Sequence, residues 1–217
     1  MARNKYPEET VSLILDVAQK LFLEKGYDNT SIQDIINGLG GLSKGAIYHH
    51  FKSKDEIMNA VSDRYNEQLV DGMMDVVKAK GLTGYQKLRR LFSMSLNSNN
   101  RDEVFEIAPN MLDNPRMLAM QVKEIFDVVS PQFVQPVIEQ GIADGSIKTQ
   151  YPKQVAEAML ILANVWMNPL VVNANAEDTK ARVQVFTAML KGVGIDLADE
   201  EMIDGYVRFC SVKEERR

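Results

Sequence analysis

Apolar residues recur at intervals of three and four positions along almost the whole of this 217-residue chain, and no stretch alternates apolar and polar residues with a period of two. The segment between Pro7 and Gly26 is typical, with Ile14, Ala18 and Phe22 on one apolar face. Spacing of this kind places apolar side chains on one side of an α-helix. The sequence therefore predicts an all-α fold with about nine or ten helices.

A second, short helix is predicted to begin at Thr30. Its hydroxyl can cap the free amides of the first turn, while the side chain of Gln33 returns a bond to the backbone. The run Gly38-Leu39-Gly40-Gly41 ends this helix, because three glycines in four positions lose too much backbone entropy in a helix interior. A further short helix is expected from Ser43 to Phe51. Two short helices joined by a glycine turn, after a longer helix, have the layout of a helix-turn-helix.

Longer helices are predicted for the rest of the chain. Ser53 and Glu56 form a capping box that opens a helix continuing to about Lys80. Breaks are expected at Asn114-Pro115 and at Ser130-Pro131, because the residue before a proline avoids helical geometry.

Composition excludes several classes of protein. Hydrophobic residues make up 45% of the chain and charged residues 25%, as in soluble globular proteins, and no run approaches the ~18 apolar residues that span a bilayer. The N-terminal residues 1–5 lead into charged residues without an apolar signal segment, so we expect a cytoplasmic protein with no membrane contact. The single cysteine, Cys210, rules out a disulfide framework and a cysteine-based zinc site. His49 and His50 are adjacent and would point in different directions on a helix, so no metal site is expected.

Charge is distributed unevenly along the chain. The net charge is −5, but residues 1–54 carry seven Lys or Arg and six Asp or Glu. The acidity therefore lies mostly outside the first 54 residues. Within that segment, Lys44, Lys52 and Lys54 cluster with aromatic residues.

The segment from Ser43 to Lys54 has the chemistry of a DNA contact. Its first turn is small apart from Lys44, and small residues let a helix end approach base edges while its free amides attract phosphate. Tyr48, His49 and Lys52 add a phenol, an imidazole and an ammonium group, which are all partners for phosphate. Lysines near a duplex release counterions, so binding should weaken steeply with salt.

These residues together resemble the DNA-binding domain of the TetR family. The resemblance covers residues 11–58, above all Leu21-Phe22-X-Glu24-X-Gly26-Tyr27-X-X-Thr30-Ser31 and Ser43-Lys44-Gly45-X-Ile47-Tyr48-His49-His50-Phe51-Lys52-Ser53-Lys54. One departure is Gly40-Gly41-Leu42, where the family has a single glycine and then a hydrophobic residue. It looks like one inserted residue, which would tilt the reading helix.

The resemblance implies that the helix starting at Ser43 enters the major groove. Lys44, Gly45 and Ala46 would face bases, and Gln33 would reach either bases or backbone. Candidates for contact with the DNA backbone are Thr30, Ser31, Tyr48, His49, Lys52 and Lys54. From the residues alone, Tyr48 could instead pack its ring between helices, and Lys52 could be a solvated charge.

The resemblance also implies two domains. A three-helix helix-turn-helix DNA-binding domain would occupy residues 1–60, and a helical domain that binds an effector and dimerises would occupy residues 61–217. Apolar helices predicted over residues 152–172 and 178–191 could form a four-helix dimer seam. The long helix from Ser53 would join the two domains as a lever.

Twelve methionines are a high number for this length and suit an adaptable pocket for an apolar or aromatic effector. Ordinary core packing is the alternative for each of these side chains. The candidate pocket residues are Phe92, Phe105, Met111, Met120, Phe126, Phe133, Met159 and Trp166.

We therefore predict a homodimeric transcriptional repressor that binds a palindromic operator in double-stranded DNA, with reading helices about one turn (~34–36 Å) apart. An effector would release the operator by binding two conformers with different affinity. Alternatives are a DNA-binding regulator without an effector, a helical protein–protein adaptor, and an all-α enzyme using Cys210. No phosphate-cradling glycine loop, His-Glu metal spacing or nucleophile beside a base is present, so we expect no enzymatic activity, catalytic residue or cofactor.

Overall fold

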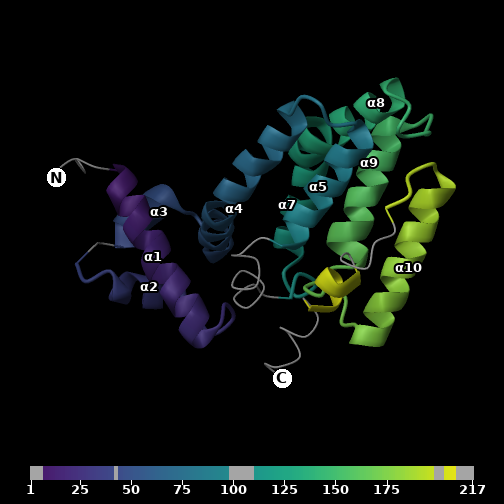
Figure 1. The fold of residues 1–217 in the computed structure, drawn as a ribbon. Coiled ribbons are helices and arrows are strands. Elements are labelled where there is room, and N and C mark those ends of the chain that lie inside the picture. The colour runs from purple at the N-terminus through teal and green to yellow at the C-terminus, as the bar shows by residue number, and fades with distance from the viewer. Residues whose placement is uncertain (1–6, 42–43, 98–109, 198–202, 209–217) are drawn as a thin grey trace.

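The computed structural model describes residues 7–41, 44–97, 110–197 and 203–208 (Figure 1). Within these ranges every regular element is a helix and none is a β-strand, which confirms the predicted all-α fold. No helix in the same ranges is both long and apolar enough to cross a membrane. Ser43, Phe105 and Cys210, which the sequence singled out, lie outside the described residues.

Three helices form the N-terminal part of the chain (Figure 1): α1 (Pro7–Lys25), α2 (Ile32–Gly38) and α3 (Lys44–His50). The first helix ends where the sequence predicted, at Gly26, whose φ of +80° lies in the left-handed region that favours glycine. All three helices contribute to one apolar core. Its completely buried side chains include Ile14, Ala18, Phe22, Ile35 and Ile47.

Thr30 does not cap α2, contrary to the prediction from sequence. Ser31 is the N-cap, because its hydroxyl accepts the N–H of Asp34 at 3.1 Å and the Asp34 carboxylate, not Gln33, accepts the N–H of Ser31 at 2.8 Å. The hydroxyl of Thr30 instead donates to the carbonyl of Gly26 at 2.8 Å. The helix begins one residue later than predicted because the Thr30 hydroxyl is used to close the turn after α1.

A long helix, α4 (Lys54–Lys78), leads from the N-terminal helices into the rest of the chain. Ser53 caps it as predicted, with its hydroxyl accepting the N–H of Glu56 at 3.2 Å. The predicted return bond is different, since the Glu56 carboxylate accepts the N–H of Lys52 at 2.7 Å. The domain boundary predicted at residue 60 falls inside α4 and stays a prediction.

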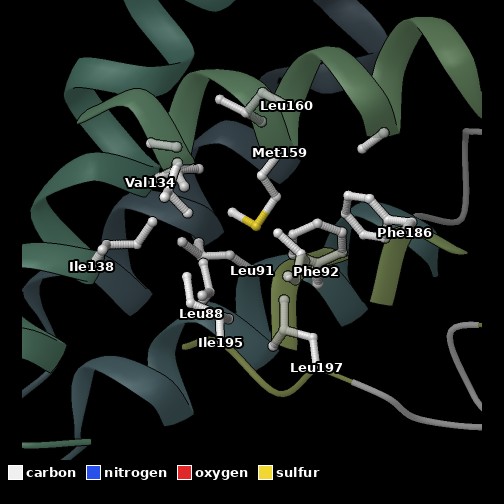
Figure 2. Close-up of a cluster of buried hydrophobic side chains, with 14 of the residues drawn as sticks. Leu88, Leu91, Phe92, Val134, Ile138, Met159, Leu160, Phe186, Ile195 and Leu197 are labelled. Carbon is white, nitrogen blue, oxygen red and sulfur yellow. The ribbon is translucent and has the colours of Figure 1, made fainter. Parts of the chain in front are cut away.

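The C-terminal part is a larger helical bundle. Figure 2 shows Phe92, Met159 and Phe186 meeting in its apolar core. The rings of Phe92 and Phe186 are 6.0 Å apart between centroids. The elements of the bundle are α5 (Gly84–Leu96), α7 (Pro115–Glu124), η1 (Ile125–Val134), α8 (Gln135–Ala143), α9 (Pro152–Ile161), η2 (Leu162–Trp166), α10 (Ala176–Gly192) and a helical turn over residues 203–208.

The break predicted at Ser130-Pro131 is wrong. The chain stays helical from α7 through η1 into α8, and Pro131 lies inside η1, which is a π-helix. In an α-helix the proline ring would collide with the carbonyl four residues earlier. The wider π turn, with bonds that span five residues, relieves this collision, and the N–H of Gln135 donates to the carbonyl of Ser130 in that pattern.

The apolar helix predicted over residues 152–172 is shorter than expected. α9 passes into the π-helical turn η2, which ends at Trp166, and the N–H of Met167 donates to the carbonyl of Leu162 at 2.9 Å. The helix predicted over residues 178–191 is confirmed as α10. The Asn114-Pro115 break is also confirmed, because α7 begins at Pro115.

Two carboxylates interact where α4 passes α7. Partial burial raises the pKa of Asp63 in α4, although Asp63 and Glu124 are both exposed by surface area. Burial also raises the pKa of Glu124, the last residue of α7, and the negative charge of Asp63 raises it further. The folded protein therefore binds protons at these positions more readily than the unfolded chain does.

Replacing Glu124 by Gln should raise the midpoint of thermal unfolding at neutral pH, because it removes a charge that the folded state disfavours. A carboxyl whose pKa is raised by folding destabilises the protein above that pKa, and the penalty disappears as the pH falls through it. The advantage of Glu124→Gln should therefore shrink on acidification, which melts followed by circular dichroism at stepped pH values would measure.

Asp127→Asn is the matched control, since Asp127 is a neighbouring carboxylate paired with Lys123 at 4.0 Å. It should not raise the midpoint. An unchanged or lower midpoint for Glu124→Gln at neutral pH would contradict the interpretation.

Candidate nucleic-acid interface

The buried side of α3 decides which of its residues face outward. Ile47 is completely buried, and Phe51, directly after the helix, is also part of the N-terminal core. The other side of α3 exposes Lys44, Tyr48 and His49. A helix of seven residues is too short to be stable alone, so packing against α1 and α2 fixes this orientation.

The turn between α2 and α3 uses glycine at two positions with positive φ. Gly40 has φ +59° and Gly41 has φ +145°. At the end of α2, a Cβ on Gly38 would come within 2.7 Å of Cγ1 of Val17, so the absent side chain allows α2 to lie close to α1. The inserted residue identified in the sequence falls in this turn, and its effect on the tilt of α3 stays a prediction.

Most of the predicted DNA contacts are exposed. The ammonium group of Lys44 lies 5.7 Å from the centroid of the Tyr48 ring, so a cation and a phenol lie side by side on α3. The side chain of Ala46 lies outside the described part of the structure, although its backbone is within α3. The exposed candidates are Ser31, Gln33, Lys44, Gly45, Tyr48, His49 and Lys52.

The second helix adds two amides and one carboxylate to this surface. Gln33 Nε2 donates to Asn37 Oδ1 at 3.0 Å, and both side chains are exposed. Asn37 was missed from the sequence, although its four-residue spacing from Gln33 places the two amides on one side of the helix. Hydrogen bonds from Ser31 hold the pKa of Asp34 at about 2, and Lys25 contacts the same carboxylate at 3.4 Å.

Thr30 does not belong to the exposed surface. Its side chain is only 1% exposed, and its hydroxyl is within 2.8 Å of the carbonyl of Gly26 and 3.3 Å of that of Leu21. A phosphate has no access to this hydroxyl. The structure therefore contradicts the prediction that the Thr30 side chain contacts DNA.

The ammonium group of Lys54 is bound by other groups of the protein. It donates to the carbonyl of Tyr27 at 2.7 Å and lies 4.0 Å from the centroid of that ring. Burial lowers the pKa of Lys54, against the opposing charges of Asp28 and Asp55. The hydroxyl of Tyr27 donates to Asp55, and burial together with Asp55 raises the pKa of Tyr27. These contacts join the start of α4 to the turn after α1, which gives Lys54 a structural role.

The residues predicted to line an effector pocket do not form a single cluster. Met120 and Phe126 are 40% and 45% exposed and lie outside the C-terminal core. Phe105 is outside the described residues. The remaining candidates are part of that core or packed against it: Phe92, Met111, Phe133, Met159 and Trp166.

Two buried polar atoms in the C-terminal bundle lack hydrogen-bond partners among the described residues. They are Oε1 of Gln121 in α7 and the hydroxyl of Ser130 in η1. Gln121 Nε2 donates to the carbonyl of Asn164 at 3.5 Å. Buried polar atoms are nearly always hydrogen-bonded, so these are positions where a bound molecule or water would complete the bonding. No spacing in the sequence signals either residue.

Comparison with known proteins identifies the DNA-binding segment. The sequence profile of the bacterial regulatory proteins of the tetR family matches residues 14–61, which run from α1 through α3 into α4. This part of the chain is therefore of the tetR type.

Similarity to individual TetR-family proteins extends into the C-terminal part. The chain is 24% identical over 197 residues to the transposon Tn10 TetC protein of Escherichia coli, covering 89% of this chain and 94% of TetC. It is 26% identical over 146 residues to the HTH-type transcriptional repressor KstR2 of Rhodococcus jostii, covering 66% and 70%. The crystal structure of a gamma-butyrolactone receptor, described as an ArpA-like protein, matches the fold with a TM-score of 0.53 at 15% identity, covering 97% and 99%. The TetR-type fold therefore includes the C-terminal bundle.

Lys54→Met should destabilise the protein by about 1–2 kcal/mol, because the carbonyl of Tyr27 loses a charged donor. It should leave the salt dependence of duplex binding unchanged, whereas loss of a phosphate contact would lower the slope by about one. Denaturant unfolding and fluorescence anisotropy at several salt concentrations would measure the two effects. Lys52→Met is the matched control. Because the Lys52 side chain is exposed, this change should leave stability unchanged and lower the slope of binding with salt. A lower slope with unchanged stability for Lys54→Met would restore Lys54 as a DNA contact.

Proposed function

We propose that this protein is a dimeric repressor of the TetR family that reads double-stranded DNA with α3 and releases it when a small molecule binds the C-terminal helices. The main support for this proposal is the exposed side of α3. Lys44 and Tyr48 are exposed to solvent there, while Ile47 on the opposite side is buried in the N-terminal core. KstR2 is described as a transcriptional repressor, which supports repression as the outcome. Action in the cytoplasm, where bacterial DNA lies, is part of the proposal.

In the proposed complex the first turn of α3 meets base edges. Lys44 can donate to O6 or N7 of guanine, and Gly45 beside it leaves room for close approach, followed by Ala46. The remaining exposed groups would position the helix on the phosphates. They are Ser31, Gln33, Tyr48, His49 and Lys52.

Selection of bound duplexes from a random pool should return a palindrome with half-sites one helical turn apart. On that duplex, Lys44→Ala should weaken binding by about 1–3 kcal/mol and relax the preference at one base, because a base contact is lost. Tyr48→Phe should weaken binding equally on all duplexes, because a phosphate contact is lost. Fluorescence anisotropy on selected and scrambled duplexes would separate the two.

Lys153→Ala is the control, since Lys153 is an exposed lysine of α9 paired with Glu157 at 3.8 Å in its own helix. It should bind both duplexes as the wild type does. Absence of both an enriched sequence and salt-sensitive duplex binding would overturn the DNA-reading proposal and favour the protein–protein adaptor.

Homodimerisation is proposed through α10, with α9 beside it. One side of α10 is buried in its own subunit through Val183, Phe186 and Leu190. A second side leaves apolar residues exposed at four-residue spacing, so they form a stripe along the helix. These are Val185, Met189 and, directly after the helix, Val193, which are 49%, 51% and 43% exposed. The other side of α10 is already packed in its own subunit, so this exposed apolar stripe is suited to packing against the same stripe of a second copy related by two-fold symmetry.

Met189→Glu should convert the dimer to a monomer, because two carboxylates would meet near the symmetry axis in an apolar seam. Analytical ultracentrifugation would measure the state, and circular dichroism would check that the helices remain. Val70→Glu, an exposed apolar position of α4 at 45%, is the matched control and should stay dimeric. A dimer that survives Met189→Glu and Val185→Glu would place the seam elsewhere.

The effector is proposed to bind beside Gln121 in the apolar interior of the C-terminal bundle. The unpartnered Oε1 of Gln121 favours a ligand with an apolar body and one hydrogen-bond donor. The gamma-butyrolactone receptor, which shares the fold, is named for a small molecule. Such a ligand releases DNA only if it binds better to a conformer that does not fit the operator. Gel shifts with compounds that raise the melting temperature test this part, and stabilising compounds that never release the operator would leave a regulator without an effector.

A further inference from the structure

Helix α7 of the C-terminal bundle also contacts the first half of α4 and the apolar core that α4 shares with the N-terminal helices. Met117, in its first turn, is 6% exposed and belongs to the N-terminal core rather than to the core of its own bundle. One turn further on, the thioether of Met120 accepts a hydrogen bond from Asn59 of α4 at 3.3 Å. The two parts of the chain are therefore joined covalently through α4 and non-covalently through α7.

Glu56 connects this contact to the segment after α3. One carboxylate oxygen, Oε1, pairs with Nη2 of Arg116 in α7 at 3.2 Å. The other, Oε2, accepts the backbone N–H of Lys52 at 2.7 Å, and Lys52 lies two residues beyond the end of α3. A single carboxylate thus links the guanidinium group of one bundle to the peptide that follows the reading helix of the other.

The placement of Arg116 has an electrostatic cost that Glu56 offsets. Arg116 is the second residue of α7, where the positive end of the helix dipole disfavours a cation. Glu56 is the third residue of α4, where the same dipole favours an anion. A carboxylate at this position therefore stabilises the first turns of both helices. Without Arg116, the orientation of the Glu56 carboxylate would depend on its hydrogen bond from the N–H of Lys52.

We propose that Arg116 is a positioning residue for DNA reading: through Glu56 it holds the segment after α3 in the arrangement that fits the operator. The inference rests on the proposed reading of DNA by α3. The pair is partly exposed, with side-chain exposures of 58% for Arg116 and 27% for Glu56, so its effect on operator affinity should be about two- to fivefold.

The test measures affinity for the duplex selected by this protein and for a scrambled duplex. Arg116→Ala should weaken binding to the selected duplex about two- to fivefold and leave binding to the scrambled duplex unchanged. Arg116→Lys, which keeps the charge, should restore most of the loss. Lys123→Ala, which removes a cation of the same helix paired only with Asp127 at 4.0 Å, is the matched control and should have no effect.

A double-mutant cycle tests whether Arg116 acts on operator binding through Glu56. Arg116→Ala should have no further effect on operator affinity in a Glu56→Ala background, because the two groups act through each other. A loss that persists in that background, or one equal on scrambled DNA, would mean that Arg116 acts as a cation near phosphate and would overturn the proposal. Operator affinity unchanged by Arg116→Ala would also overturn it.

Amide hydrogen exchange tests the same link without DNA. The N–H of Lys52 donates to Glu56, so Arg116→Ala should speed its exchange, while Lys123→Ala should not. Unchanged exchange at Lys52 would overturn the route through Glu56. If random-pool selection returned no sequence, the DNA-reading function would fail, yet this measurement would still decide whether Arg116 positions the segment after α3.

Discussion

Burial of one side of α3 is the interaction on which the proposed DNA-binding surface depends. A seven-residue helix gains too few hydrogen bonds to offset its nucleation, so its orientation comes from packing. Because Ile47 is buried, Lys44 and Tyr48 must point outward. The surface proposed to meet DNA is therefore a consequence of the core on the opposite side of α3.

That core extends across the junction between the two parts of the chain. Lys54 and Tyr27 tie the start of α4 to the turn after α1, and Met117 of α7 fills the same core from the other bundle. The core that packs against α3 therefore includes a side chain of α7. A ligand among the C-terminal helices could act on DNA binding through α7 as well as through the predicted lever, α4.

Local patterns in the sequence predicted the elements whose causes lie within one helical turn. The α1 helix followed from apolar spacing, and the cap by Ser53 followed from the pair of Ser53 and Glu56. Thr30 and Ser31 are equally suited to cap α2, and the choice depends on the carbonyl of Gly26, which takes the Thr30 hydroxyl. No periodicity signals the Glu56–Arg116 pair, because its members belong to different helices and their proximity is set by tertiary packing.

The predicted pocket residues are not all in one cluster, because composition was the only guide to them. Met120 lies before η1 and Phe126 near its start, and these two side chains are 40% and 45% exposed. Aromatic and methionine content could not predict this exposure, since such side chains occur both in cores and on exposed faces.

The energetic scale of these contacts indicates where a conformational change would occur. Within the N-terminal helices, moving α3 alone would expose Ile47 and Phe51, at a cost of about 1.5–3 kcal/mol for each side chain. Among the described residues, the contacts of α7 with α4 and the N-terminal core include a partly exposed ion pair, a weak bond to a thioether and one buried methionine. An effector can shift an equilibrium only by its difference in affinity for the two states. Separating α7 from α4 exposes one buried side chain, Met117, whereas moving α3 alone exposes two, so we expect a change between α7 and α4 to cost less than one within the N-terminal core.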